Sequence, residues 1–133
     1  MKKSKLIILS IAIIFILWGF ISKTPTLKGF YQSEVNGYHI QILIREEDNS
    51  FVEWIDNREV DRGTYEKVDT SLYTIKGNKQ SFELTLNDDN SFEIVINKLN
   101  NGNPISMKNI STDDYRISFG KWDDVDKYKS LLD

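Results

Sequence analysis

The chain has few residues of the kinds that usually carry catalysis. His39 is the only histidine among 133 residues, and there is no cysteine. A hydrolytic triad needs a histidine beside a serine and an acid, and no Gly-x-Ser-x-Gly motif is present. Zinc sites usually take several histidine or cysteine ligands. We therefore expect no metal and no cofactor, and we place His39 on a solvated strand face.

Carboxylates are the remaining candidates. Acidic residues cluster at 46–48, 88–89 and 123–126. We interpret these clusters as hairpin tips and a helix start, since the spacing of a calcium-binding loop is missing. Glu53 and Glu93 could form the carboxylate pair of a glycosidase-type hydrolase. Because we expect both side chains on outward strand faces, we predict that the protein is not an enzyme and keep the hydrolase as a second alternative.

The charge distribution argues against nucleic-acid binding. Four of the 17 lysines and arginines lie in residues 1–23, so the remaining 13 stand against all 20 aspartates and glutamates, a net charge of −7. Such a domain repels nucleic-acid phosphates, and no basic stripe offsets this.

The elements that must position these residues begin with an apolar segment. Residues 6–21 carry no charge and follow Lys2, Lys3 and Lys5. This pattern is typical of a signal anchor or a cleaved signal peptide. Bulky residues stand where cleavage needs small ones, so we expect a single-pass anchor in the cell membrane, with residues 6–21 in the lipid bilayer; a buried core helix is the other alternative. The preceding lysines place the N-terminus in the cytoplasm.

The remainder alternates with a period of two, which is typical of β-strands. Ile40, Ile42 and Ile44 share one strand face, and Asn36-Gly37 predicts a tight hairpin. Turn signals recur every 8–12 residues, as in antiparallel barrels and sandwiches. We therefore predict an all-β fold: a single antiparallel eight-strand barrel or sandwich with a short C-terminal helix at 122–131, preceded by one transmembrane helix. The predicted divisions are an anchor at 1–23, a linker at 24–28 and an extracytoplasmic β domain at 29–133.

Aromatic residues supply the one surface candidate. Most of them are explained by core filling. Trp54, however, falls on the opposite strand face from Phe51 and Ile55, together with Val52. If exposed, it would mark a partner or ligand surface; if covered by the C-terminal helix or by Trp122, it would be core. Val52, Trp54 and Trp122 are therefore the candidate partner or ligand surface.

A family resemblance rests on the arrangement of these segments. The chain has Gly29-Phe30-Tyr31 in its first strand, hairpins that restart with Asn-Ser-Phe, a Gly63-Thr64-Tyr65 strand and a terminal helix. Together they resemble small lipocalin-like, or calycin-type, β-barrel domains of exported proteins from Gram-positive bacteria. The resemblance implies a closed or partly closed barrel, which either holds an apolar ligand or is filled by its own side chains.

Two function classes follow from this interpretation. The first is a membrane-anchored, extracytoplasmic, non-catalytic binding or interaction module, of an accessory or immunity type, which meets a protein, a peptide or a small apolar ligand. The alternative is a calycin-type carrier of a small apolar ligand. Large inward side chains would favour the module, whereas a cavity of several hundred cubic ångströms would favour the carrier.

Overall fold

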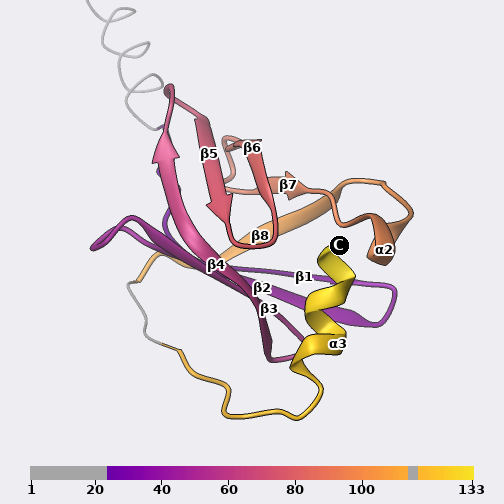
Figure 1. The fold of residues 1–133 in the computed structure, drawn as a ribbon. Helices are drawn as coiled ribbons and strands as arrows, with labels where there is room; N and C mark the ends of the chain where they lie inside the picture. The colour runs from indigo at the N-terminus through magenta and orange to yellow at the C-terminus, as the bar shows by residue number, and fades with distance from the viewer. Residues whose placement is uncertain (1–23, 114–116) are drawn as a thin grey trace, which may run out of the picture.

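The computed structural model describes residues 24–113 and 117–133. These residues form an antiparallel eight-strand barrel that is nearly closed, with short helical pieces near its C-terminus (Figure 1). The strands are β1 (Gly29–Val35), β2 (Tyr38–Arg45), β3 (Ser50–Ile55), β4 (Arg58–Lys67), β5 (Leu72–Gly77), β6 (Ser81–Thr85), β7 (Phe92–Ile94) and β8 (Ile105–Ser111). The helical pieces are α2 (Asn97–Asn100), α3 (Val125–Lys129) and the 3₁₀ turn η1 (Ser130–Leu132). The prediction of an all-β eight-strand fold is confirmed, and it takes the barrel form, which is compatible with the lipocalin-like resemblance.

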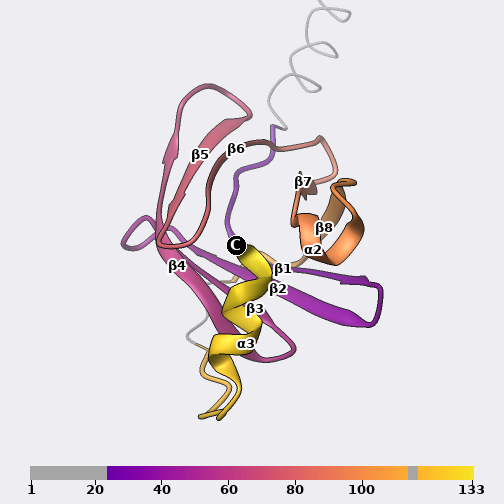
Figure 2. The ribbon, with the colours of Figure 1, turned by 45° about the vertical axis from the view of Figure 1, so that its right-hand side comes forward.

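Most strands pair with their sequence neighbours. The order in the sheet is β6-β5-β4-β3-β2-β1-β8-β7. The first strand, β1, therefore pairs with the last strand, β8. The predicted Asn36-Gly37 hairpin connects β1 and β2, and both residues have positive φ, 50° and 84°. This is the backbone that a type I′ turn requires, and asparagine and glycine adopt it at little cost. The barrel curls until β6 and β7 approach each other as its two free edges (Figures 1 and 2).

The barrel interior is a packed hydrophobic core. Ile40, Ile42 and Ile44 of β2 point inward, as their spacing predicts, and Leu27 is fully buried among the core residues. The Leu27 amide donates a hydrogen bond to the Tyr73 hydroxyl at 3.2 Å. The segment before β1 therefore packs into the barrel although it forms no strand or helix.

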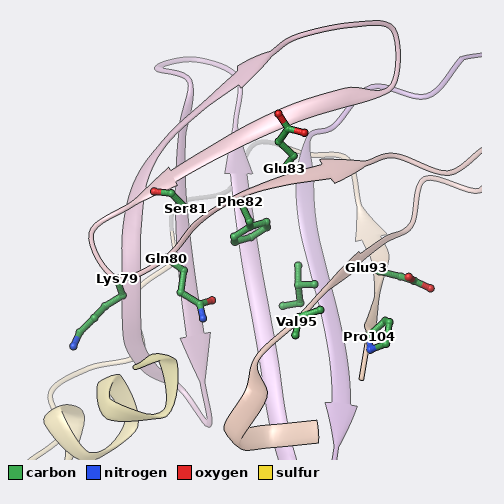
Figure 3. Close-up of a pocket in the computed structure, with 9 residues that line it drawn as sticks. Lys79, Gln80, Ser81, Phe82, Glu83, Glu93, Val95 and Pro104 are labelled. Atoms are coloured by element: carbon green, nitrogen blue, oxygen red, sulfur yellow. The ribbon is translucent and has the colours of Figure 1, made fainter. Parts of the chain in front are cut away.

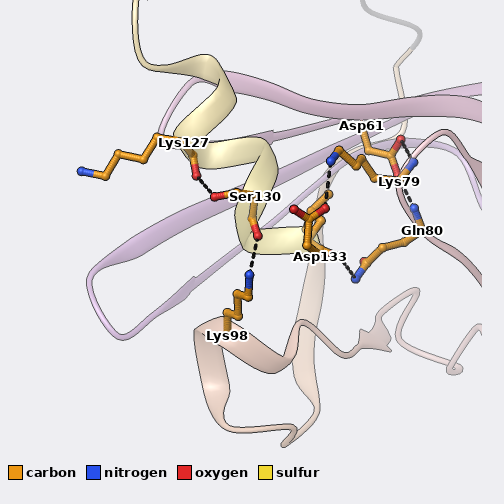
Figure 4. Close-up of polar contacts among 8 residues, drawn as sticks. Asp61, Lys79, Gln80, Lys98, Lys127, Ser130 and Asp133 are labelled. Atoms are coloured by element: carbon orange, nitrogen blue, oxygen red, sulfur yellow. Dashed lines mark hydrogen bonds and ion pairs between the residues drawn. The ribbon is translucent and has the colours of Figure 1, made fainter.

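The C-terminus is fastened to the barrel by polar contacts (Figure 4). Lys79 forms an ion pair with Asp133 at 2.8 Å, and the Gln80 side chain donates to the Leu132 carbonyl at 3.3 Å. Lys98 of α2 donates to the Ser130 carbonyl at 2.9 Å. Leu132 itself is buried in the core. Residues 130–133 are thus packed and hydrogen-bonded against the barrel.

The C-terminal helix differs from its prediction in one respect. It starts at Val125 rather than Trp122, and Asp124 makes no side-chain capping hydrogen bond to it. Both oxygens of Asp124 instead accept hydrogen bonds from Arg58 of β4. The Asp124 carboxylate, which was expected to favour the first turn of the helix, therefore pairs with Arg58, which is distant in sequence.

The predicted anchor at 1–23 lies outside the described residues. Within the ranges that the structure does describe, no helix combines the length and the apolar character that crossing a bilayer requires.

Candidate functional site

Trp54, the first of the three candidate surface residues, is buried. Only 4% of it is exposed, and its ring centroid lies 5.3 Å from that of Phe119 in a T-shaped contact. Phe119 belongs to residues 117–124, which precede α3. Val52, on the same strand face as Trp54, is partly exposed. Trp54 is therefore covered, but by Phe119 and not by the C-terminal helix or Trp122, the two covers considered from the sequence.

Trp122 is 42% exposed, but it is engaged by an arginine. The Arg58 guanidinium lies 3.7 Å from the centroid of the Trp122 ring and 4.6 Å from that of Tyr128. Its Nε and Nη2 donate to the two oxygens of Asp124, each at 3.0 Å. This stacked and bidentate arrangement suits the planar guanidinium. We call Arg58, Trp122, Asp124 and Tyr128 the arginine latch; it holds the C-terminal segment against β4, so Trp54 and Trp122 serve different contacts.

Glu53 corrects another expectation. It was placed on the outward face of β3, but its side chain points into the barrel and is 3% exposed. The period of two in fact puts it on the same face as Phe51 and Ile55, both of which are buried. Burial, and secondarily the charge of Asp61, raises the pKa of Glu53 to about 8. Glu53 therefore remains a neutral acid at neutral pH. Glu93 is exposed, as expected.

Asp61, the cross-strand partner of Glu53, is held by main-chain donors. Its carboxylate accepts hydrogen bonds from the amides of Arg62, Lys79 and Gln80 at 2.8, 2.9 and 3.0 Å. Two of these amides lie in the turn between β5 and β6 (Figure 4). Backbone amides stabilise a carboxylate anion. One buried acid is thus provided with donors, whereas none is recorded for Glu53 among the described residues.

The space beside Glu53 is very small. A void of about 10 Å³ lies inside the barrel. One water needs about 10–15 Å³, so the void is at the lower limit for a single water. The side chains around it are otherwise apolar and are contributed by five strands: Ile42, Ile44, Phe51, Ile75, Phe82, Leu84 and Phe92. Glu93 does not line this void, so Glu53 and Glu93 do not converge there in a cleft that a substrate could enter.

A groove of about 540 Å³ lies on the outside of the barrel, where β6 faces β7. We call it the seam groove. Phe82 of β6 and Val95, which follows β7, lie on its two sides (Figure 3). Val95 is 47% exposed. The complete lining consists of Lys79, Gln80, Ser81, Phe82, Glu83, Glu93, Ile94, Val95 and Pro104.

The backbone at this seam is not paired. Gly77 donates to the Gln80 carbonyl at 2.9 Å and so closes the β5–β6 hairpin. Bonded and non-bonded positions alternate in an antiparallel pair. The main-chain groups of Phe82 therefore face β5, whereas those of Ser81 and Glu83 face the seam. No backbone hydrogen bond between β6 and β7 is found within the described ranges, so an edge with free donors and acceptors borders the groove.

Among the described residues that line the groove, two of the three charged side chains are acidic. Glu83 and Glu93 are exposed on its two sides. Lys79, at one end, is already paired with Asp133. The groove therefore combines an apolar floor at Phe82, Val95 and Pro104 with an acidic rim. The sequence did not reveal this site, because no local pattern shows where a barrel fails to close.

The other polar candidates offer less. His39 lies on the outer face of β2, partly buried, with its Nδ1 3.6 Å from a Glu34 carboxylate oxygen. Among the described residues no group of three or more histidine, aspartate or glutamate side chains is placed to hold a metal ion.

Comparison of the chain with protein-family models, with curated proteins and with solved structures finds no match.

Proposed function

We propose that the protein is a non-catalytic binding module, anchored in the cell membrane by its N-terminal segment, that binds an extended segment of a partner protein in the seam groove. The observation that carries this proposal is the contrast between two spaces. The outer groove measures about 540 Å³, whereas the void inside the barrel measures about 10 Å³. Sites for drug-sized ligands usually occupy about 300–1,000 Å³. The groove has such a size, and the interior does not.

The chemistry of the groove favours a peptide. Main-chain groups of Ser81 and Glu83 face the seam without a sheet partner, so an extended segment can hydrogen-bond to them as an added strand does. Phe82 and Val95 offer contacts to an apolar side chain. Glu83 and Glu93 attract lysine or arginine beside it. The occupant is therefore a protein segment with an apolar residue flanked by basic ones.

The packed interior weighs against the carrier alternative. The inward residues are large, and Tyr31, Tyr73 and Phe92 are almost completely buried. Such side chains fill a narrow eight-strand barrel. Placement of the domain outside the cytoplasm rests on the basic and apolar pattern of residues 1–23.

Site-specific photocrosslinking in the native membrane tests the proposal. Two exposed valines form a matched pair: Val95 lines the groove, whereas Val68, which follows β4, does not. A photoreactive residue at 95 is expected to join one extended, lysine- or arginine-containing segment of a partner, and the same residue at 68 is expected not to. Equal adducts from both positions, or none from 95, would overturn the proposal.

A further inference from the structure

The seam groove and the interior void meet at one side chain. Phe82 borders both spaces, and it is the only residue that their linings share within the described part of the chain. It is partly buried and packs against the core. We call the Phe82 side chain the wall between the two spaces. Glu53 lies on its inner side and Val95 on its outer side. Displacement of Phe82 would therefore connect a buried acid with solvent.

The wall stands at the weakest part of the barrel. Strand β6 is hydrogen-bonded to β5, and in the part of the chain that the structure describes it forms no strand pairing with β7 across the seam. The turn between β6 and β7 is closed by Asn87, whose main-chain amide donates to the Ser91 carbonyl at 2.8 Å. Opening at the seam therefore breaks apolar contacts without breaking a ladder of backbone hydrogen bonds, and local opening is expected where such bonds are few.

On the inner side of Phe82 lies Glu53, whose ionised form is disfavoured by its surroundings. Glu53 is 3% exposed, and within the described ranges burial and the charge of Asp61, without a hydrogen bond, act on its carboxyl group. The residues around the void on β2, β5, β6 and β7 are apolar, and none of the described lysine, arginine or histidine side chains borders it. Within residues 24–113 and 117–133, the charged group that acts on Glu53 is the Asp61 carboxylate of β4. An ionised Glu53 therefore needs water, and the void has room for about one molecule.

From this arrangement we infer that Phe82 is a gate controlled by the protonation of Glu53: loss of the Glu53 proton to solvent displaces Phe82 outward, admits water and widens the seam groove. The inference concerns the groove itself and holds whatever the groove binds. Its consequence is that the groove has a closed form at acidic pH and an open form at alkaline pH.

The pH range of the switch follows from linkage. In the open form Glu53 is hydrated, so its pKa falls towards its ordinary value, whereas in the closed form burial raises its pKa to about 8. Between these values ionisation favours the open form, by about tenfold per pH unit, since 1.4 kcal/mol corresponds to one unit. Above the closed-form value the opening equilibrium levels off.

Amide hydrogen exchange on the full-length protein in mild detergent tests the gate. Exchange is measured from about pH 5 to about pH 9, and each rate is divided by its intrinsic value at that pH. Protection in β6 and β7 is expected to fall by up to about tenfold per unit and then to level off, while β1 and β2 stay protected. E53Q is expected to abolish this slope, and E93Q, which alters an exposed glutamate of the same groove, to retain it.

A second variant covers the case in which E53Q fails to fold. F82A removes the wall, so protection in β6 should be low at acidic pH and nearly independent of pH. The gate is refuted if the wild type shows no slope, if E53Q or F82A keeps the full wild-type slope, or if β1 and β2 lose protection in parallel with β6.

Discussion

Glu53 and Asp61 lie directly across from each other on β3 and β4, and both carboxyl groups are buried. Asp61 accepts three backbone hydrogen bonds, whereas Glu53 adjoins a nearly dry void. The charge of Asp61 adds to the effect of burial on Glu53. The barrel therefore keeps one acid neutral beside another that is supplied with donors.

This pair predicts a pH-dependent effect of E53Q. The pKa of Glu53 is about 8 in the folded protein and near 4.5 when the chain is unfolded. Between these values the folded state binds more protons than the unfolded state, so the free energy of unfolding falls as pH rises. Glutamine does not titrate. E53Q should therefore gain stability over the wild type by several kcal/mol between about pH 5 and about pH 8, at about 1.4 kcal/mol per unit.

Urea unfolding of both proteins across this range is the measurement. E93Q serves as the control, because Glu93 is exposed and its replacement should shift the curve little at any pH. A constant difference between E53Q and the wild type at all pH values would contradict the buried, neutral Glu53.

Gly77 provides a second prediction, on the turn that holds Asp61. A Cβ at this position would collide with the Asp61 carboxylate and lie 2.6 Å from the Gln80 carbonyl oxygen. G77A should therefore displace the carboxylate from its amide donors and lower stability by about 1–3 kcal/mol. G37A is the matched control: Gly37 has open space around it, and its positive φ alone is expected to cost about 1 kcal/mol. Thermal unfolding that ranks G37A as the more damaging would contradict this role.

The arginine latch predicts that R58K is not a conservative change. Lysine keeps the charge but loses the two-pronged contact with Asp124 and the stacking on Trp122 and Tyr128. Hydrogen exchange in α3 should rise by about tenfold, while exchange in β1 stays unchanged. If R58K protects α3 as well as wild-type Arg58 does, the stacking and the paired hydrogen bonds are not what holds the segment.

Phe119 predicts a spectroscopic change. It covers Trp54 in an edge-to-face contact of a kind worth about 0.5–1.5 kcal/mol beyond its buried area. F119A should expose the Trp54 indole, shift its fluorescence to longer wavelength and increase quenching by acrylamide. The contribution of Trp54 is obtained by subtracting the emission of W54F from that of the wild type, and the emission of W54F/F119A from that of F119A. An identical Trp54 contribution with and without Phe119 would contradict the proposed cover.

Some of the fold could be predicted because it depends on local patterns. The spacing of Ile40, Ile42 and Ile44 identified an inward strand face, and Asn36-Gly37 identified a hairpin. Glu53 was misplaced because its residue type was given more weight than its position between Phe51 and Ile55. The same alternation would have put it inside.

Other features depend on contacts between distant parts of the chain. Trp54 is covered by Phe119, 65 positions later, and Asp124 pairs with Arg58 instead of capping its own helix. The seam groove exists because β6 and β7, at the two ends of the strand order, approach without pairing. No period or turn motif encodes the quality of this closure, so the candidate site could not be predicted from the sequence.

The central claim is that an extended segment binds at the β6 edge and not inside the barrel. The most direct measurement is amide exchange of the full-length protein with and without a synthetic peptide that copies the segment crosslinked at position 95. We predict that the peptide slows exchange at Ser81 and Glu83, whose main-chain groups face the seam, and leaves Ile42 and Ile44 unchanged. Protection gained instead at the inward strands, or none at β6, would contradict the claim.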